Sequence, residues 1–308
     1  MRLPRPYLLV CLAAALFAQQ PIRVDVHLVS VGFSVRDAAG KLVTDMTRDE
    51  VEVLEDGVPQ KIAFFARSTD VPLKLGLLMD VSGSQESFVK PHVKDLQTFL
   101  KSVLGPKDEA FMVCFGNRLR LVSDFTNSPK ALVNGLELFH KGKTEFPEIG
   151  PREHRVLGTA FYDAIYHSTQ QLMRNEEARR KALIIFSDGE DNSSAHHMME
   201  AIEAAQAGNV LLFSVRYTES RDGRLNARNK YGIGVMERIA KETGGADYDA
   251  REKGLKSNFE QIGEQLRSSY ELAYHSTDPV SDGSFRKIKI RVKREGVTVR
   301  AKTGYYTR

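Results

Sequence analysis

The sequence predicts an α/β protein with a doubly wound, mostly parallel sheet and a small β module built from the N- and C-terminal segments. Two patterns of apolar and polar residues along the chain support this fold class. In the middle, short continuous apolar runs alternate with helical patterns, which is typical of strands buried on both faces of a parallel sheet. At both ends, apolar and polar residues alternate, which is typical of strands with one face in a core. Alternating strands and helices favour the open, doubly wound architecture.

We predict four segments along the 308 residues. They are a signal peptide at 1–18, an N-terminal β segment at 22–69, the α/β domain at 70–270 and a C-terminal β segment at 271–308. Neither end has enough strands to be stable alone, because an isolated hairpin is only marginally stable. We therefore expect the two ends to pack together.

The N-terminus has the pattern of a secretory signal. In MRLPRPYLLVCLAAALFAQQPIR, Arg2 and Arg5 precede an apolar run of twelve residues. Such a run is too short to span a membrane and has the length of a signal-peptide core. We expect cleavage after Ala18, with Ala15 as the alternative site, and an uncleaved anchor or a buried N-terminal helix as the alternative structure. The prediction is a secreted or periplasmic protein with no transmembrane segment after signal removal.

The amino-acid composition excludes some classes of protein and of partner. Hydrophobic residues make up 42% and charged residues 27% of the chain, which is a globular composition. The net charge of +4 is small for this length and argues against nucleic acid as the partner. Once the signal is removed, Cys114 is the only cysteine, so the mature chain can form no internal disulfide.

The alternating texture predicts individual strands at both ends. VDVHL and VSVGFSV alternate after Arg23, and VEVLEDGVPQKIAFF predicts a hairpin around Asp56-Gly57. Near the other end, RKIKIRVK alternates, a turn is expected at Glu295-Gly296, and VTVRA alternates again.

Four continuous apolar runs predict the buried strands of the central sheet. They are LKLGLLM, AFMVCF, ALIIFS and VLLFSV. Apolar residues recurring on one face predict a helix over 88–104, and others follow around 198–205 and 259–266. AFMVCF and LRLVSDF are separated only by Gly116, Asn117 and Arg118, which is short enough for a hairpin. We therefore expect one antiparallel strand at an edge of the sheet.

Oxygen-bearing side chains follow these runs, at the end of the sheet where ligands bind in doubly wound folds. They are Asp80, Ser82 and Ser84 after LKLGLLM, Thr159 at the start of a helix, and Asp188 after ALIIFS. A set of hydroxyls and carboxylates without His or Cys suits Mg²⁺, Mn²⁺ or Ca²⁺ rather than Zn²⁺. Two carboxylates only just balance a divalent charge, so the ion would accept an outside ligand. Helix capping is the simpler interpretation of the first three residues alone.

The same residues resemble a known family. DVSGS at 80–84, the Thr of GTAFYDA and the Asp of FSDGED are similar to the metal-ion-dependent adhesion site of von Willebrand factor A domains, in the order D-x-S-x-S, Thr, Asp. The resemblance implies that Ser82, Ser84 and Thr159 coordinate the ion through hydroxyls. It implies that Asp80 and Asp188 bind directly or through water, and that a partner's carboxylate completes the shell.

The resemblance covers nearly the whole mature chain. ERIAKETGGADYDA, LKSNFEQIGEQLRSSYELAY and FRKIKIRVKREGVTVRAKTGYY resemble a bacterial, acidobacterial-type group of secreted von Willebrand A-domain proteins that carry flanking β segments. The stretch KGKTEFPEIGPREHRVLG departs from helical period before Thr159. We expect it near the metal face, where it would supply partner contacts or occlude the site.

Other polar residues favour simpler roles. We expect Asp163 to accept hydrogen bonds from loop amides, and Glu190 and Asp191 to face solvent in a turn or to support the metal ligands. His196 and His197 are adjacent, so in a helix they would point about 100° apart and could not readily share an ion. We expect both to lie on the surface.

These observations predict an exported, metal-ion-dependent, adhesion-type module that binds an acidic residue of a partner protein. No nucleophile elbow or phosphate-binding loop is present, so we do not expect an enzyme. One alternative is a metal-dependent hydrolase with Asp163 or Glu190 as general base. Another is a structural envelope protein with a stabilising ion.

The basic strand near the C-terminus leaves a separate choice open. Its basic residues lie on one face: Lys287, Lys289, Arg291 and Lys293. We favour a solvated outer face with lysines protecting a sheet edge. The alternative is contact with an anionic envelope surface or an acidic partner.

Overall fold

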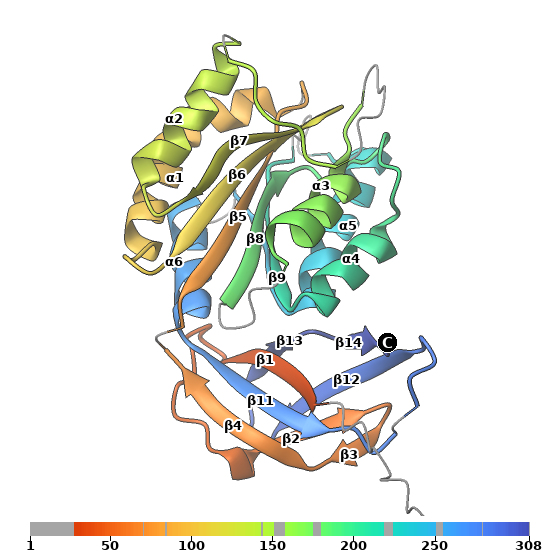
Figure 1. Ribbon diagram of the computed structural model, residues 1–308. Coiled ribbons are helices and arrows are strands. Elements are labelled where there is room, and N and C mark those ends of the chain that lie inside the picture. Colours follow the sequence, from red (N-terminus) through yellow and green to blue (C-terminus); the bar gives the residue numbers. More distant parts are fainter. Residues whose placement is uncertain are drawn as a thin grey trace, which may run out of the picture.

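The computed structural model describes residues 28–69, 71–83, 85–142, 144–150, 158–174, 180–218, 224–250, 255–278 and 280–307, with backbone only for 86–92. The predicted signal peptide and Ser84 lie outside the described residues. Figure 1 shows a domain of strands and helices above a domain made almost entirely of strands. No helix among the described residues is long and apolar enough to cross a membrane.

The helices and strands follow one another in the order that the pattern of apolar and polar residues predicts. The helices are η1 (Arg48–Glu50), α1 (Glu86–Val103), α2 (Pro129–His140), α3 (Phe161–His167), η2 (Ser168–Leu172), α4 (Met198–Ala207), α5 (Ala227–Thr243) and α6 (Leu255–Arg267). The strands are β1 (Leu28–Arg36), β2 (Val51–Glu55), β3 (Val58–Gln60), β4 (Ile62–Ser68), β5 (Leu73–Asp80), β6 (Glu109–Phe115), β7 (Leu119–Thr126), β8 (Arg180–Ser187), β9 (Val210–Arg216), β10 (Asp247–Asp249), β11 (Ser269–His275), β12 (Phe285–Val292), β13 (Thr298–Ala301) and β14 (Gly304–Tyr306).

The upper domain is built on one six-stranded sheet with the order β10-β9-β8-β5-β6-β7. All neighbours are parallel except β6 and β7. Every residue of β5 is buried, as its continuous apolar run predicts. The predicted antiparallel strand is β7, and it lies at the edge of the sheet. The predicted α/β fold class is confirmed.

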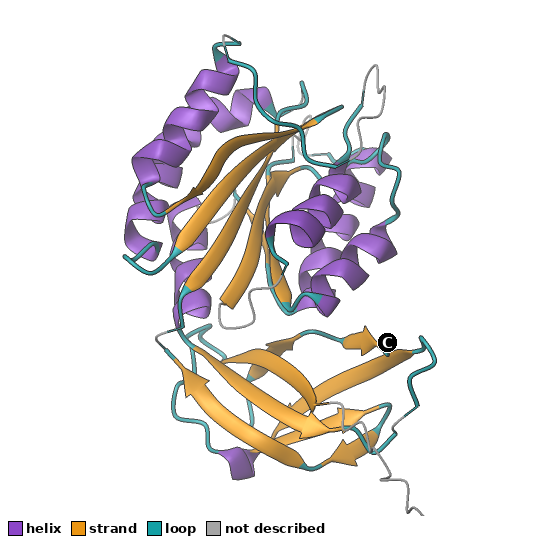
Figure 2. Ribbon diagram, viewed as in Figure 1, coloured by secondary structure: helices purple, strands orange, loops and turns teal. Residues whose placement is uncertain are grey.

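Helices cover both faces of this sheet (Figure 2). Apolar residues of α1, α2 and α6 form a core on one face, where Phe99 stacks on Phe259 with ring centroids 4.4 Å apart. Residues of α3, α4 and α5 form a second core on the other face, with Phe161, Ile202 and Ile239 among them. The sheet is therefore doubly wound.

The lower domain consists of two four-stranded antiparallel sheets that each use both ends of the chain. Their orders are β13-β1-β11-β4 and β14-β12-β2-β3. Val31, Val53, Leu272 and Ile288 share one buried core between them. Neither end could bury this core without the other, so the predicted joint β module is confirmed.

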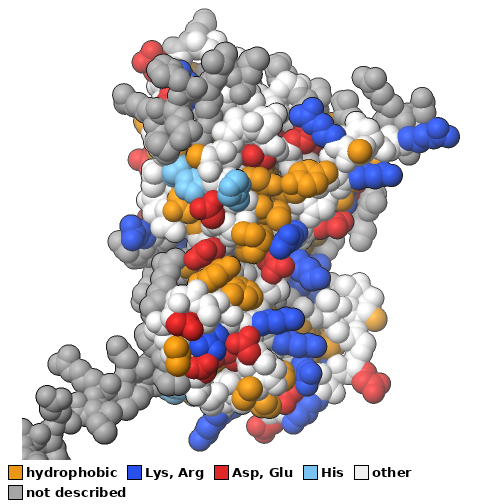
Figure 3. Space-filling model, turned by 90° about the vertical axis from the view of Figure 1, so that its right-hand side faces the viewer, with side chains coloured by type: hydrophobic (Ala, Val, Ile, Leu, Met, Phe, Trp, Pro, Cys, Tyr) orange, Lys and Arg blue, Asp and Glu red, His pale blue; other side chains and the backbone are white. Residues whose placement is uncertain are grey.

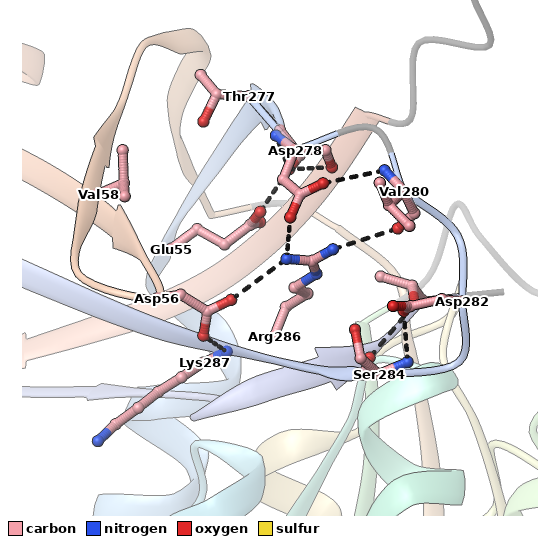
Figure 4. Close-up of polar contacts among 12 residues, drawn as sticks. Glu55, Asp56, Val58, Thr277, Asp278, Val280, Asp282, Ser284, Arg286 and Lys287 are labelled. Atoms are coloured by element: carbon pink, nitrogen blue, oxygen red, sulfur yellow. Dashed lines mark hydrogen bonds and ion pairs between the residues drawn. The ribbon is translucent and has the colours of Figure 1, made fainter.

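The hairpin between β2 and β3 turns where the sequence predicts it. Asp56 and Gly57 both have positive φ, 49° and 87°, which is the conformation that a tight two-residue hairpin turn requires. Asp56 also belongs to a polar network around Arg286 (Figure 4). Arg286 contacts Asp278, lies 3.7 Å from Asp56 and donates to the carbonyl of Val280 at 3.3 Å.

The expectation that the lysines of β12 protect a sheet edge is wrong. Strand β12 lies between β14 and β2 in its sheet: residues 285–287 pair with β14, and residues 288–292 pair with β2. Lys287, Lys289 and Arg291 are exposed, while Ile288 and Ile290 are buried, as the alternation predicts. Figure 3 shows Lys and Arg side chains spread over the lower domain, with Asp and Glu among them. The basic face is an outer face of an internal strand.

Strand order places the predicted metal residues at one crevice. The chain leaves β5 toward β6 on one side, and β8 lies on the other side of β5. The order therefore reverses between β5 and β8, and the loops that follow these two strands diverge. In open α/β sheets this is the point where ligands bind. Asp80 is the last residue of β5, and Asp188 directly follows β8.

Candidate functional site

Asp80 is a wholly buried carboxylate at the crevice, with a relative exposure of 0%. Its Oδ2 accepts a hydrogen bond from the Ser187 hydroxyl at 2.6 Å, and its Oδ1 accepts one from the Ser82 amide at 2.9 Å. The pKa of Asp80 is raised to about 6, because burial and, to a lesser extent, the charge of Asp188 raise it more than the hydrogen bonds from Ser187 and Ser82 lower it. A cation beside it would compensate for the lost hydration of the ionised form.

Asp188 is the second acidic residue of the crevice and is also buried. Its Oδ1 accepts the Glu190 amide at 3.2 Å, and its Oδ2 accepts Nε2 of Gln85 at 3.0 Å. The same Nε2 lies 3.4 Å from the carbonyl of Tyr217, so both contacts require the amide nitrogen on this side. The loop after β5 is thereby connected to the loop after β8.

The other atom of the Gln85 amide, the oxygen Oε1, is also in the interior of the protein. This oxygen has no hydrogen-bond partner among the described residues. A buried carbonyl oxygen without a donor is unfavourable unless a water, an ion or another group satisfies it. The crevice thus holds two carboxylates, which suit a hard divalent cation, next to a glutamine whose own oxygen has no donor.

Thr159 lies on the third segment at this edge, two residues before α3. Its amide donates to Asn192 Oδ1 at 2.7 Å, and its carbonyl accepts the amides of Asn192 at 3.1 Å and Ser193 at 3.3 Å. Gly158 makes this close approach feasible, because a Cβ there would come within 2.5 Å of Asn192 Oδ1. The loop after β8 therefore holds Thr159 as well as Asp188.

The predicted ligands lie on three segments that the fold brings to one edge of the sheet. Asp80 and Ser82 follow β5, Asp188 follows β8, and Thr159 is hydrogen-bonded to the loop that carries Asp188. Ser84 lies outside the described residues. The ligand set itself stays a prediction.

Glu190 and Asp191 differ from the solvent-facing turn residues that the sequence suggests. Glu190 forms an ion pair with Arg228 at 2.5 Å, and burial, followed by the charge of Asp188, raises its pKa. Asp191 Oδ1 accepts the amides of Phe161 at 2.9 Å and Tyr162 at 3.3 Å, so it caps α3 from another loop. Sequence reasoning missed this role because the cap lies thirty residues after the helix it closes.

The predicted contact of Asp163 with loop amides is confirmed. This wholly buried side chain accepts the Ala195 amide through Oδ2 and the His196 amide through Oδ1, both at 3.0 Å. His196 Nδ1 also lies 2.7 Å from Asp163 Oδ1. His196 is only partly exposed rather than a surface residue, because α4 begins only at Met198 and the preceding loop folds back onto α3, whereas His197 is exposed as expected.

A third side chain joins this pair. His167 lies one turn after Asp163 on α3, and one ligand atom from each of Asp163, His167 and His196 can be chosen so that all three lie within 4.8 Å of one another. The structure therefore contains an Asp/His group that could hold a metal ion, apart from the predicted oxygen site. The sequence signal was the spacing of four between Asp163 and His167, which places both on one face of a helix.

The stretch predicted to border the metal face is described in part, since 143 and 151–157 lie outside the described residues. In the described part, Leu121 donates to the carbonyl of Pro147 at 2.9 Å, and Ile149 donates to the carbonyl of Leu119 at 3.1 Å. Ile149 is buried in the core beneath α3. This segment is attached to the start of β7.

Comparison of the sequence with protein-family profiles and with curated proteins finds no match. Among solved structures, the chain is similar to a von Willebrand factor type A structure from Catenulispora acidiphila, with 12% identity over 92% of this chain and 74% of that chain and a TM-score of 0.46. It is also similar to the conserved hypothetical protein BatB from Bacteroides thetaiotaomicron, with 17% identity over 63% of this chain and 97% of that chain and a TM-score of 0.46.

A further similar structure is an aerotolerance-related membrane protein from Bacteroides fragilis, with 16% identity over 63% of this chain and 98% of that chain and a TM-score of 0.43. These similarities concern the arrangement of the backbone. The family remains a prediction from the sequence motifs.

Proposed function

We propose that this chain is an exported protein-binding module that uses a divalent cation, Mg²⁺ by preference and Mn²⁺ or Ca²⁺ as alternatives, to bind an acidic residue of a partner protein. One observation supports this above the others. The buried carboxylates of Asp80 and Asp188 lie at the point where strand order reverses, and the pKa of Asp80 is raised mainly by burial and to a lesser extent by the charge of Asp188. Two like charges brought together in a buried crevice favour a cation between them.

The residues that would hold the ion are Asp80, Ser82, Ser84, Thr159 and Asp188. The ion would act as the electrophile for the partner's carboxylate. The chain's own residues keep the two carboxylates in place: Ser187 holds Asp80, and Gln85 holds Asp188. The segment at 140–157 borders Thr159 along the chain, and we propose that it sets partner specificity.

The surroundings of the two candidate general bases, Asp163 and Glu190, favour a binding function over an enzymatic one. Asp163 is wholly buried and accepts two backbone amides. Glu190 is paired with Arg228. A general base must reach the proton that it removes, and both carboxylates are already engaged. We therefore propose a module without enzymatic activity.

The first experiment measures Mg²⁺ binding by titration calorimetry on the metal-free chain. Asp80→Asn keeps the shape and removes the charge, and Asp124→Asn removes one exposed acidic group from β7 as a matched control. We expect wild type and Asp124→Asn to bind one ion each, and Asp80→Asn to lose at least about tenfold in affinity. Equal affinity in all three proteins would contradict the proposed site.

The same three proteins then test partner recognition. Each is immobilised and exposed to envelope extract with Mg²⁺ or with EDTA. We expect a partner that wild type and Asp124→Asn retain only with Mg²⁺, and that free acetate displaces because it offers the same carboxylate. Partners retained equally in EDTA would assign recognition to the β module instead, where the exposed face of β12 with Lys287, Lys289 and Arg291 is the proposed contact for an anionic envelope surface.

A further inference from the structure

The group formed by Asp163, His167 and His196 differs in chemistry from the oxygen site. It offers two imidazole nitrogens and one carboxylate, and the candidate ligand atoms lie within 4.8 Å of one another. Two of the three residues lie one turn apart on α3, and the third comes from the loop after β8. Nitrogen and carboxylate ligands of this kind suit Zn²⁺ and neighbouring transition metals rather than Mg²⁺.

The positions of these side chains are fixed before any ion binds. Asp163 is held by the amides of Ala195 and His196. The ring of His196 stacks on Tyr166, with centroids 3.7 Å apart and an interplanar angle of 18°. It lies nearly perpendicular to the ring of His167, at 83° and 5.2 Å. A site whose ligands are already ordered loses little conformational entropy on binding.

His167 is fixed by its own surroundings. Its Nδ1 lies 3.4 Å from Nε2 of Gln171, one turn further along the chain. An amide nitrogen donates, so this contact uses the lone pair of Nδ1, and an ion that binds His167 through Nδ1 would replace the Gln171 amide there. Gly150 packs so closely on the ring that a Cβ there would lie 2.7 Å from Cδ2 of His167. A larger residue at 150 would displace the imidazole.

Access comes from one side. Asp163 has no exposed side-chain surface, and His167 is buried, whereas 22% of the His196 side chain is exposed. An ion can therefore reach the group past His196, and three protein ligands leave further coordination positions for water. Because His196 contacts Asp163 through Nδ1, an ion bound at that nitrogen would replace a proton.

We propose that Asp163, His167 and His196 bind one transition-metal ion of the Zn²⁺ class, as a second metal site independent of the one around Asp80. The ion would link α3 to the loop after β8. That loop also carries Asp188 and holds Thr159 through Asn192. The proposed role is to stabilise the loop that supplies the oxygen site.

The test uses the chain purified without a histidine tag and made metal-free. Zn²⁺ is titrated in competition with a chromogenic chelator, and Mg²⁺ is kept in excess so that the oxygen site does not contribute. His196→Gln removes the accessible ligand. His197→Asn is the matched control: it removes the neighbouring histidine and keeps a residue that caps α4 well.

We expect one equivalent of Zn²⁺ in wild type, in His197→Asn and in Asp80→Asn, and at least about a 100-fold loss of affinity in His196→Gln. Binding that persists in Asp80→Asn separates this site from the proposed adhesion site, so either can fail alone. Less than one equivalent in wild type, or equal affinity in His196→Gln, would overturn the proposal.

A second measurement does not depend on the folding of a variant. Co²⁺ replaces Zn²⁺ in wild type, and its visible spectrum reports the ligands and geometry. Bands of a low-coordinate ion with nitrogen ligands are expected, and excess Zn²⁺ should remove them. The spectrum of hydrated Co²⁺ would contradict the site, and would leave the contact of Asp163 with His196 as a structural hydrogen bond.

Discussion

Asp80 and Glu55 occupy equivalent positions in the two parts of the molecule, since each is the buried last residue of a strand. Glu55, at the end of β2, accepts hydroxyl hydrogen bonds from Tyr274 at 2.7 Å, Tyr305 at 2.9 Å and Ser276. Asp80, at the end of β5, accepts one hydroxyl and one amide.

The difference lies in what else surrounds the two carboxylates. Glu55 is enclosed by three neutral donors that contribute their hydrogen bonds only to the fold. Burial is the main cause of the raised pKa of Asp80, and the like charge of Asp188 beside it adds to the increase. A carboxylate in the first environment is complete without a ligand, whereas one in the second gains from a cation. The comparison separates a structural carboxylate from one suited to binding.

The largest effect is expected from removing the structural carboxylate. Glu55→Ala leaves the hydroxyls of Tyr274, Tyr305 and Ser276 without their acceptor, and we expect a loss of about 4 kcal/mol in the free energy of unfolding. Glu55→Gln retains an acceptor oxygen of the same shape and should cost about 1 kcal/mol. Urea unfolding measures both. Equal stability of the two variants would mean that the three hydroxyls do not depend on Glu55.

Removing the charge of Asp80 should have the opposite effect on stability: in the metal-free protein it should raise the free energy of unfolding as the pH rises. The pKa of Asp80 is about 6 when the chain is folded, against an ordinary value of 3.8. The group therefore contributes stability that is fully present below pH 3.8 and is lost as the pH rises through about 6. The loss reaches about 3 kcal/mol, and Asp80→Asn should abolish it.

The measurement is urea unfolding in EDTA from pH 4 to pH 7.5, with wild type and Asp80→Asn compared at each pH. Other carboxylates titrate in both proteins and cancel in the difference. The variant should become the more stable protein as the pH rises, and Mg²⁺ should restore wild type alone. A difference that does not change with pH would show that Asp80 titrates normally and would remove the physical basis of the oxygen site.

The sequence predicted the region of Asp80 better than the network of Glu55. Continuous apolar runs define buried strands, and a carboxylate or hydroxyl directly after such a run lies at the carboxyl end of the sheet. Asp80 and Asp188 could be placed by this rule alone. The contacts of Glu55 depend on Tyr274 and Tyr305, more than two hundred residues away, and no local pattern encodes the register that joins them.

The same limit explains the histidines. Adjacent His196 and His197 would diverge in a helix, but His196 lies in the loop before α4, where its backbone direction is set by Asp163. The sequence predicted Asp163 as an acceptor of loop amides, and it could not identify the loop. For β12, alternation identified the exposed residues, but pairing with both β14 and β2 follows from how the two ends of the chain meet.

The smallest effect is expected from a substitution that changes the position of Thr159 and leaves every predicted ligand in place. Gly158 has φ +123°, and a Cβ would lie 2.5 Å from Asn192 Oδ1. Gly158→Ala should therefore cost about 2 kcal/mol and displace Thr159. Gly142→Ala is the control, because Gly142 also has positive φ, 63°, and no atom lies within 4 Å of its Cβ position.

Gly142→Ala should cost about 1 kcal/mol through backbone strain alone and leave Mg²⁺ affinity unchanged. Gly158→Ala should lose stability and Mg²⁺ affinity together, because the loop that holds Thr159 also carries Asp188. Urea unfolding and titration calorimetry on the two variants decide the matter. If Gly158→Ala lost stability and kept full Mg²⁺ affinity, Thr159 would belong to the scaffold of the crevice, and the ion would depend on the loops after β5 and β8 alone.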